Sequence, residues 1–437
     1  MRSLVLAVAT LSVIGFPMTA VPEQTPVDAA QAPPIVLRAA RMLDVRTGEV
    51  TGNPVLVIEA ERISAVGSGL PIPRDARVID LGSATLLPGL IECHAHLMAR
   101  LGPREPYYAQ LVMRSQAMRA LEGAASARET LEAGFTTVRD AGSEGAGYAD
   151  VALRDAINGG LVPGPRLFVS ARAIAAVGQY FPFGVSPDLE GRLTGAQMIS
   201  GAEEARRAVR EQIGHGADFI KIYADWQYPT LTVDEMRVIV EESHKLHRTV
   251  AAHASTPEGI RNAVTAGVDA IEHGFQPDRE TLQIMQQRGT FLVLTVGTMY
   301  PALEEAKSES QRASLEKQTE PIRRTIAAAK QIGVKIAGGL DAGRADLQGK
   351  NARQLVVLVK LGMTPLEALR TQTVDAAELL GWADRVGTLE PGRFADVIAV
   401  DGNPLADIGT LERVRFVMKG GAVVKSASVT GDSTPHR

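Results

Sequence analysis

The stretch ATLLPGLIECHAHL, residues 84–97, decides how the rest of the chain is interpreted. An apolar run leads into two histidines, His94 and His96, that are separated by one residue. Side chains at i and i+2 of a β-strand point to the same face, so both imidazoles are available to one metal ion. Histidine pairs at strand ends also occur without a metal, so the pair alone leaves both interpretations open.

The composition is that of a globular protein. The chain has 437 residues, of which 45% are hydrophobic and 22% charged, and its net charge of -4 gives no indication of nucleic-acid binding. Its one cysteine, Cys93, excludes an intramolecular disulfide. Strand alternation points Cys93 away from the two histidines, so we interpret it as a packing residue.

The amino terminus predicts an export signal. Arg2 is followed by an almost unbroken apolar stretch over residues 4–20, and residues 21–34 form a polar linker. We therefore expect a signal peptide over residues 1–20, with an uncleaved membrane anchor as the alternative. No other stretch reaches the roughly 18 uncharged apolar residues of a membrane-spanning helix. The mature protein is expected to be periplasmic or secreted, without membrane contact.

Short β-rich runs separated by glycine-containing turns occupy both ends of the chain. They lie in residues 35–87 and again in residues 385–427, and the last ten residues, 428–437, are expected to be a disordered tail. Neither set is large enough to bury a core alone. We therefore expect the two sets to pair into one small β-sandwich.

The intervening residues, 88–384, alternate short apolar strands with amphipathic helices. This alternation predicts an α/β fold, specifically a (β/α)8 TIM barrel, with a doubly wound open sheet as the alternative. The expected strands cover residues 89–96, 136–140, 166–171, 219–224, 249–254, 270–273, 290–296 and 334–339. Helical spacing is clearest over residues 202–213, 232–246, 257–265 and 320–332.

Catalytic groups of such barrels lie at the carboxyl ends of the strands. Residues capable of metal binding or catalysis occur at these positions in five of the eight predicted strands: His94, His96, Lys221, His253, His273 and Asp341. Each of them has an ordinary interpretation, as a core histidine, a strand-edge lysine or a turn-capping aspartate. The joint pattern is much more specific than any member and favours a metal centre.

The residue types fit divalent metal chemistry. Imidazoles suit Zn, Fe, Mn or Co, and a carboxylate adds negative charge. Lys221 fits if its amine is neutral, because desolvation and nearby positive charge both disfavour the ammonium form. A neutral amine can add carbon dioxide, and the resulting carbamate offers two oxygens that can bridge two metal ions.

The ordered set of two histidines, lysine, two histidines and aspartate resembles the amidohydrolase superfamily, in its two-metal branch with a carboxylated lysine. The resemblance covers residues 35–427 and includes the phrases LPGLI (87–91), GFTTVRD (134–140), GADFIK (216–221) and GTLEPGRFAD (387–396). These phrases are similar to those of Xaa-Pro and Xaa-Arg dipeptidases, imidazolonepropionase-like proteins and ochratoxin-degrading amidases.

The resemblance implies a role for each ligand. His94 and His96 would bind the first metal, His253 and His273 the second, and the Lys221 carbamate would bridge them. Asp341 would bind the first metal and act as general base on the bridging hydroxide, with zinc the expected metal. Tyr223 follows Lys221 by two residues on the same strand face, so its phenol either donates to the oxyanion or packs.

The expected substrate contacts come from the strand-end loops. Arg139, Arg172 and Arg344 are candidates to bind a substrate carboxylate, each with a structural ion pair as its alternative. Tyr180 is a candidate aromatic pocket wall. Relatives commonly carry a histidine in the loop where Gly178-Gln179-Tyr180 stands, and another where Gln348 stands, so the pocket departs from the family pattern.

We therefore expect a metal-dependent amidohydrolase that cleaves the amide bond of a dipeptide or N-acyl amino acid, including ochratoxin A-type acyl-phenylalanines. Hydrolysis of a cyclic amide, as in imidazolonepropionase relatives, is the alternative, and an inactive metal-binding barrel is the distant one. The expected partner is a small molecule, with no nucleic acid, and members of the family often form homo-oligomers.

Overall fold

The computed structural model describes residues 33–178, 188, 194–226, 229–306 and 308–426. The predicted signal peptide, nearly all of the predicted linker, the predicted tail and Tyr180 lie outside the described residues. Within the described ranges, none of the helices is both long and apolar enough to cross a bilayer.

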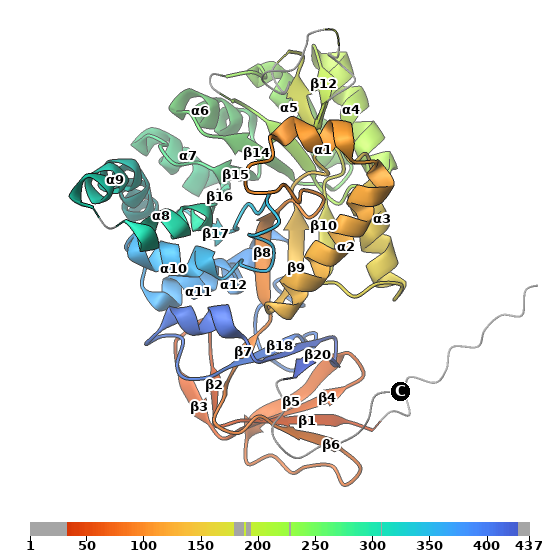
Figure 1. Ribbon diagram of the computed structural model, residues 1–437, viewed down its shortest axis with the longest axis vertical. Coiled ribbons are helices and arrows are strands. Elements are labelled where there is room, and N and C mark those ends of the chain that lie inside the picture. Colours follow the sequence, from red (N-terminus) through yellow and green to blue (C-terminus); the bar gives the residue numbers. More distant parts are fainter. Residues whose placement is uncertain (1–32, 179–187, 189–193, 227–228, 307, 427–437) are drawn as a thin grey trace, which may run out of the picture. The chain divides into compact units, whose positions relative to one another are not determined.

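Eight parallel strands form the predicted (β/α)8 barrel, which is confirmed (Figure 1). A backbone hydrogen bond from Asp218 N to Val169 O, 2.7 Å long, connects the third and fourth barrel strands. Another from Asp341 N to His94 O, 2.9 Å long, connects the eighth to the first. The strands are β8 (Leu90–Ala95), β9 (Phe135–Asp140), β10 (Arg166–Val169), β13 (Ile220–Tyr223), β14 (Val250–Ala254), β15 (Ala270–His273), β16 (Phe291–Leu294) and β17 (Ile336–Gly338).

Helices cover the outside of these strands, as Figure 1 shows. Several begin at a capping box, in which a Thr or Ser hydroxyl and a Glu or Gln side chain bond reciprocally to backbone amides, as Thr232 and Glu235 do. The helices are α1 (Tyr107–Met113), α2 (Gln116–Glu132), α3 (Ala149–Asn158), α4 (Ala202–Gly214), α5 (Val233–Lys245), α6 (Pro257–Ala266), α7 (Arg279–Arg288), α8 (Tyr300–Glu305), α9 (Glu309–Ile332), α10 (Arg353–Lys360), α11 (Pro365–Thr371) and α12 (Val374–Leu379).

Two local features differ from the expectation. Helix α9 begins well before residue 320, because a capping box formed by Ser308 and Gln311 starts it there. After β10, a short parallel pair extends the sheet, consisting of β11 (Ala173–Ala176) and β12 (Ala196–Ile199). Strand β11 also pairs with β13 through Ile174 and Ile222.

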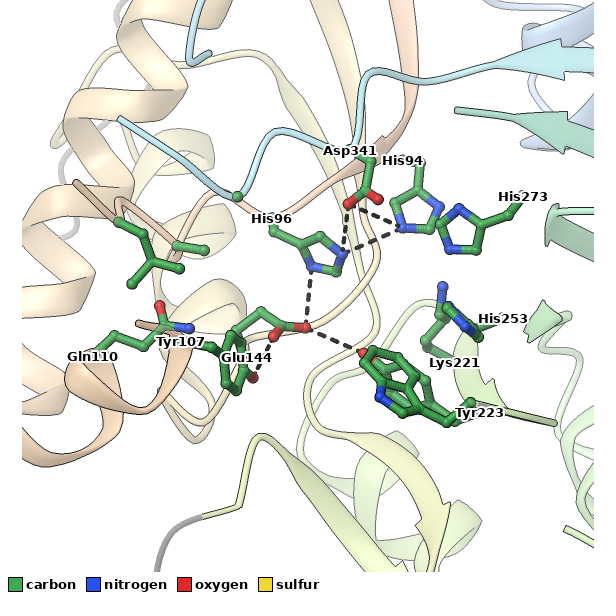
Figure 2. Close-up of a pocket in the computed structure, with 14 residues that line it drawn as sticks. His94, His96, Tyr107, Gln110, Glu144, Lys221, Tyr223, His253, His273 and Asp341 are labelled. Atoms are coloured by element: carbon green, nitrogen blue, oxygen red, sulfur yellow. Dashed lines mark hydrogen bonds and ion pairs between the residues drawn. The ribbon is translucent and has the colours of Figure 1, made fainter. Parts of the chain in front are cut away.

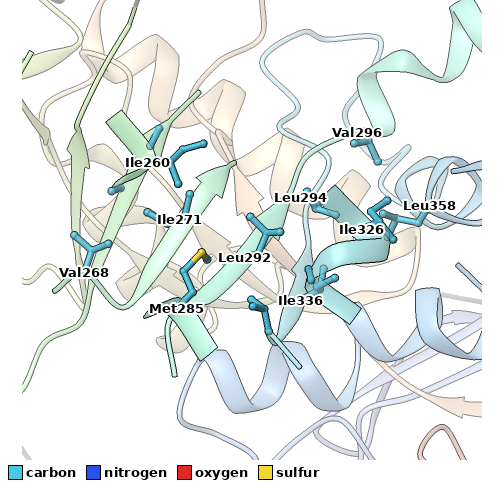
Figure 3. Close-up of a cluster of buried hydrophobic side chains, with 14 of the residues drawn as sticks. Ile260, Val268, Ile271, Met285, Leu292, Leu294, Val296, Ile326, Ile336 and Leu358 are labelled. Carbon is cyan, nitrogen blue, oxygen red and sulfur yellow. The ribbon is translucent and has the colours of Figure 1, made fainter. Parts of the chain in front are cut away.

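The main core lies between the strands and the helices. Ile271, Leu292 and Leu294 point from the strands toward helix residues such as Met285 and Ile326 (Figure 3). Alternation along β13 places Ile220 and Ile222 in this outer core. It therefore turns the intervening side chain of Lys221, and that of Tyr223, toward the inside of the barrel, where both line a cavity.

The two ends of the chain share a small β domain, as predicted. Strand β7 pairs antiparallel with β18, for example Leu87 with Ile398. The apolar residues of this domain form their own core, which includes Leu56, Leu86, Ala399 and Phe416. One sheet has the order β5-β4-β1-β6 and the other β20-β19-β18-β7-β2-β3. Their strands are β1 (Ile35–Arg38), β2 (Arg41–Leu43), β3 (Val50–Gly52), β4 (Pro54–Glu59), β5 (Arg62–Ser68), β6 (Arg77–Asp80), β7 (Thr85–Pro88), β18 (Val397–Val400), β19 (Phe416–Lys419) and β20 (Ala422–Ser426).

Gly89, between β7 and β8, joins the small domain to the barrel. Its amide donates to Asp396 O at 2.9 Å, and a Cβ added there would lie 2.1 Å from Thr136 Oγ1, which is buried. We expect Gly89→Ala to lower the free energy of unfolding by about 1–3 kcal/mol, because the surrounding side chains must shift. Chemical denaturation measures this difference.

Gly214→Ala is the matched control, since a Cβ at this helical glycine meets nothing within 4 Å. It should leave the free energy of unfolding unchanged or raise it by up to about 1 kcal/mol. Equal stability of the Gly89→Ala and wild-type proteins would contradict the close packing at this joint.

Candidate metal centre

Six predicted ligands come together at the carboxyl ends of the barrel strands. They surround a cavity of about 220 Å³ (Figure 2). Strands β8, β13, β14 and β15 and the loop after β17 supply them, and they are His94, His96, Lys221, His253, His273 and Asp341.

The first group consists of His94, His96 and Asp341. The Nε2 atoms of His94 and His96 are 3.3 Å apart. Asp341 Oδ1 lies 3.4 Å from His96 Nε2 and 3.8 Å from His94 Nε2. Three potential ligand atoms therefore converge on one point. Three protein ligands of this kind are enough to hold one metal ion.

The second group consists of His253, His273 and Lys221. The rings of His253 and His273 are 4.5 Å apart, edge to face, and the His273 ring is 5.1 Å from that of His94. One ligand atom each of His94, His273 and Asp341 lies within 4.8 Å of the other two, so the groups are contiguous. Lys221 extends from β13 into the cavity that both groups line, and it is 1% exposed.

Hydrogen bonds orient three of the imidazoles. Nδ1 of His94 lies 2.6 Å from Glu272 Oε2, Nδ1 of His273 lies 2.7 Å from Thr295 Oγ1, and Nδ1 of His96 lies 3.2 Å from Gly142 O. In each ring this contact directs Nε2 toward the centre. Second partners of this kind fix the tautomer and ring orientation of metal-binding histidines.

Burial favours the uncharged forms of the ligands. Desolvation is the main reason that the pKa values of His94, His253 and His273 lie well below the usual range. Desolvation also lowers the pKa of Lys221 to about 8. Neutral imidazoles and a readily deprotonated amine are the forms that bind metals or add carbon dioxide.

Arg139 does not line this cavity, which corrects its assignment as a substrate anchor. Its Nη2 donates to Glu272 Oε1 at 2.6 Å and its Nε donates to Cys93 O at 2.6 Å, all in the buried interior. The structural ion pair that we kept as the alternative is therefore present, but with Glu272 as partner. Through Glu272, Arg139 supports the ring of His94.

The other predicted substrate contacts are also absent from the described cavity lining. Arg344 forms a two-pronged ion pair with exposed Asp346, at 2.7 and 3.0 Å. The Arg172 guanidinium lies 3.4 Å from Ala196 O. The position of Tyr180 lies outside the described residues. Among the residues that the structure describes, no arginine lines the cavity.

Tyr223 lies where the sequence places it, and it has an unexpected neighbour. The Tyr223 hydroxyl donates to Glu144 Oε1 at 3.3 Å, and the Tyr107 hydroxyl donates to Glu144 Oε2 at 2.5 Å. Tyr107, from α1, and Glu144, from the loop after β9, both line the cavity. Sequence analysis did not identify either one, although Glu144 follows a strand end in the same way as the ligands.

Glu92 is a second residue that the sequence analysis missed. It accepts from the amides of His94 (2.8 Å) and Leu340 (3.0 Å) and from the Asn351 side chain (2.7 Å). Complete burial raises its pKa to about 8. Because it precedes His94 by two residues, the alternation that groups His94 with His96 includes Glu92 as well.

The backbone is unusual at several of these positions. His273, Asp341 and Glu144 have φ values of 70°, 60° and 52°. Positive φ is uncommon outside glycine and typically costs about 1–3 kcal/mol, so it persists where the surroundings enforce it. These conformations turn strand-end side chains inward.

The donor set fits two divalent cations. The set contains four imidazoles, one carboxylate and the amine of Lys221, whose pKa is lowered by burial. Zinc, iron, manganese and cobalt bind nitrogen and oxygen ligands of this kind. Their ligand atoms face one cavity, and none of the three arginines brings a competing positive charge into its described lining.

Relatives of known activity share this architecture. The chain is 32% identical to ochratoxinase of Aspergillus niger over 87% of this chain and 85% of the relative. It is 25% identical to imidazolonepropionase of Symbiobacterium thermophilum, over 83% and 86% of the two chains. A crystal structure of a Xaa-Pro dipeptidase with methionine bound in its active site superposes with a TM-score of 0.78 and 32% identity, over 89% of this chain and 99% of that one.

Residues 85–424 match the amidohydrolase family, and this range contains the barrel and all six converging ligands. The chain is an enzyme that hydrolyses carbon-nitrogen bonds and belongs to the amidohydrolase family.

Proposed function

We propose that the protein hydrolyses the linear amide bond of a dipeptide or N-acyl amino acid, using two divalent metal ions, zinc in the first instance. The observation that carries the proposal is the convergence of the six ligands on a cavity that also contains Tyr223. The similarity to ochratoxinase and to the Xaa-Pro dipeptidase supports a linear amide. The apolar run over residues 4–20 supports export to the periplasm or medium.

The ligand assignment is the one that the family resemblance implies, and the grouping of the side chains around the cavity supports it. His94, His96 and Asp341 would hold one ion and His253 and His273 the other, with a Lys221 carbamate between them. When bound, the two ions would supply a nucleophilic hydroxide near neutral pH and polarise the scissile carbonyl.

Asp341 is placed to move the proton. Its carboxylate is beside His96, and its side chain remains 32% exposed toward the cavity, unlike the buried histidines. It can therefore accept a proton from the attacking water and deliver it to the departing nitrogen, which leaves poorly unless it is protonated.

Tyr223 completes the reacting groups. Its phenol lies in the cavity beside Lys221 and His253 and is held toward Glu144. When substrate is bound, the single phenol proton would leave Glu144 and be donated to the oxyanion that develops on the carbonyl oxygen.

A substrate panel tests the proposal. Xaa-Pro and Xaa-Arg dipeptides, N-acyl-phenylalanine and ochratoxin A are incubated with the zinc-loaded protein, with cyclic imides and lactones as controls. We expect cleavage of linear amides only. Cleavage confined to the cyclic substrates would replace the proposal with an imidazolonepropionase-like activity, and no cleavage at all would contradict both.

Asp341→Asn should lower kcat/KM by about 10²- to 10⁴-fold, because the amide cannot shuttle the proton. Bound metal, measured by elemental mass spectrometry, should be largely retained. Asp346→Asn, in the same loop and paired with exposed Arg344, is the control and should stay within about twofold of wild type. Wild-type turnover by Asp341→Asn would refute the mechanism.

Lys221→Ala should lose most of its bound metal, because it removes the proposed bridging carbamate. Added acetate should restore part of the metal and of the activity by supplying the missing oxygens. Lys335→Ala, which changes an exposed lysine paired with Glu378, is the control. Two ions retained by Lys221→Ala without acetate would show that no carbamate bridge is needed.

A further inference from the structure

A second cavity, of about 600 Å³, lies at the end of the barrel opposite the candidate metal site. Residues from the amino-terminal ends of barrel strands line it, including Phe219 just before β13, Thr249 just before β14 and Phe291 at the start of β16. We propose that this cavity binds a small aromatic carboxylate, with the carboxylate on Arg139 and the ring among aromatic side chains. The inference does not rest on the proposed function, because none of the six candidate metal ligands lines this cavity.

Arg139 brings a buried hydrogen-bond donor to this cavity. The residue is 4% exposed, and its Nε and Nη2 atoms donate to Cys93 O and Glu272 Oε1. Its third nitrogen, Nη1, has no hydrogen-bond partner among the described residues, yet protein atoms do not enclose it completely. Because Arg139 lines this cavity and not the other, Nη1 faces it. Buried polar groups normally have a partner, and a ligand carboxylate would provide one through a charge-assisted hydrogen bond.

The charged groups of the lining favour an anion. Each acidic residue in the described lining has a basic partner, and the pairs are Asp218 with Arg154, Asp269 with His244 and Glu378 with Lys335. Arg248, which also lines the cavity, has no carboxylate partner among the described residues. Its guanidinium bonds only to the backbone carbonyls of Ala217 and His247, both at 3.3 Å. A guanidinium in this state attracts a negatively charged ligand.

Aromatic side chains form much of the cavity wall. The chain contains ten Phe and two Trp residues. Four of these twelve line this one cavity, and they are Phe168, Phe219, Phe291 and Trp382. The rings of Phe168 and Trp382 are 4.6 Å apart, edge to face. Such walls offer stacking and edge contacts to an aromatic ring, and the combination of aromatic walls with a few polar groups is typical of small-molecule sites.

The cavity opens to solvent. Four of its lining residues are exposed, namely His247, Thr249, Gly289 and Gly381. A ligand can therefore enter without displacement of a barrel strand. The competing explanation is that the aromatic rings only close this end of the barrel by packing. In that case the cavity would bind no small aromatic acid, or would bind it no better than a neutral compound of the same shape.

Tryptophan fluorescence can report on this cavity alone. Of the two tryptophans, Trp382 lines this cavity and Trp226 lines the other. The full-length Trp226→Phe protein therefore has a single tryptophan, and it is titrated with 3-phenylpropanoate and with the neutral 3-phenylpropanamide. We expect a saturable change in Trp382 emission. The acid should bind roughly 5- to 20-fold more tightly than the amide, which is the difference between a charge-assisted and a neutral hydrogen bond.

Two arginine variants in this background test the proposed contacts. Arg139→Lys keeps the positive charge but loses Nη1, so it should weaken binding of the acid by about tenfold or more. Arg248→Gln removes a positive charge from the lining. It should weaken binding of the acid by roughly fivefold and leave that of the amide within about twofold. Metal content and thermal unfolding are measured for each variant.

Arg324→Gln, which changes an exposed arginine of α9 paired with Glu320, is the control and should bind both probes as its parent does. Unchanged Trp382 emission with both probes, or equal affinity for acid and amide, would overturn the inference. Parental affinity for the acid in Arg248→Gln would also overturn it, even if Arg139→Lys does not fold. None of these measurements uses turnover, so the inference and the proposed function can fail independently.

Discussion

The hydrogen bond from Asp341 N to His94 O joins the ends of the first and last barrel strands. The same two residues supply candidate ligand atoms, so closure of the barrel also brings His94 Nε2 and Asp341 Oδ1 within 3.8 Å of each other. Glu92 reinforces this closure, since it accepts from the amides of both His94 and Leu340. The candidate metal site therefore depends on closure of the barrel, and displacement of either strand end would separate the side chains that form it.

Two buried carboxylates fix His94, one at its backbone amide and the other at its ring. Glu92 accepts from its backbone amide, while Glu272 contacts its ring and is in turn bound by Arg139. An unpaired carboxylate would be costly in this interior, and the Arg139 guanidinium offsets that cost for Glu272. Arg139 thus contributes to the cavity indirectly, because it fixes Glu272, which in turn orients the ring of His94.

The fold, and the convergence of the candidate ligands on one cavity, could be predicted because strand alternation and strand ends follow from the local sequence, as in the spacing of His94 and His96 or of Lys221 and Tyr223. The partners of charged groups could not be predicted in this way. Arg139 finds Glu272 across 133 residues, and Tyr223 finds Glu144 across 79, contacts that only the closed barrel creates. For the same reason, the sequence did not reveal that Arg139 pairs with Glu272 or that Glu144 lines the cavity.

The pairing of β7 with β18 has a consequence for biosynthesis. The Thr85 hydroxyl bonds to the carbonyl of Gly402, 317 residues later. At a ribosomal rate of about 5–20 residues per second, β7 waits some tens of seconds before β18 emerges. During this time the edge of β7 that pairs with β18 has unpaired backbone N–H and C=O groups, although β2 can already cover its other edge, which makes the nascent chain a candidate for chaperone binding until synthesis of the last strands is complete.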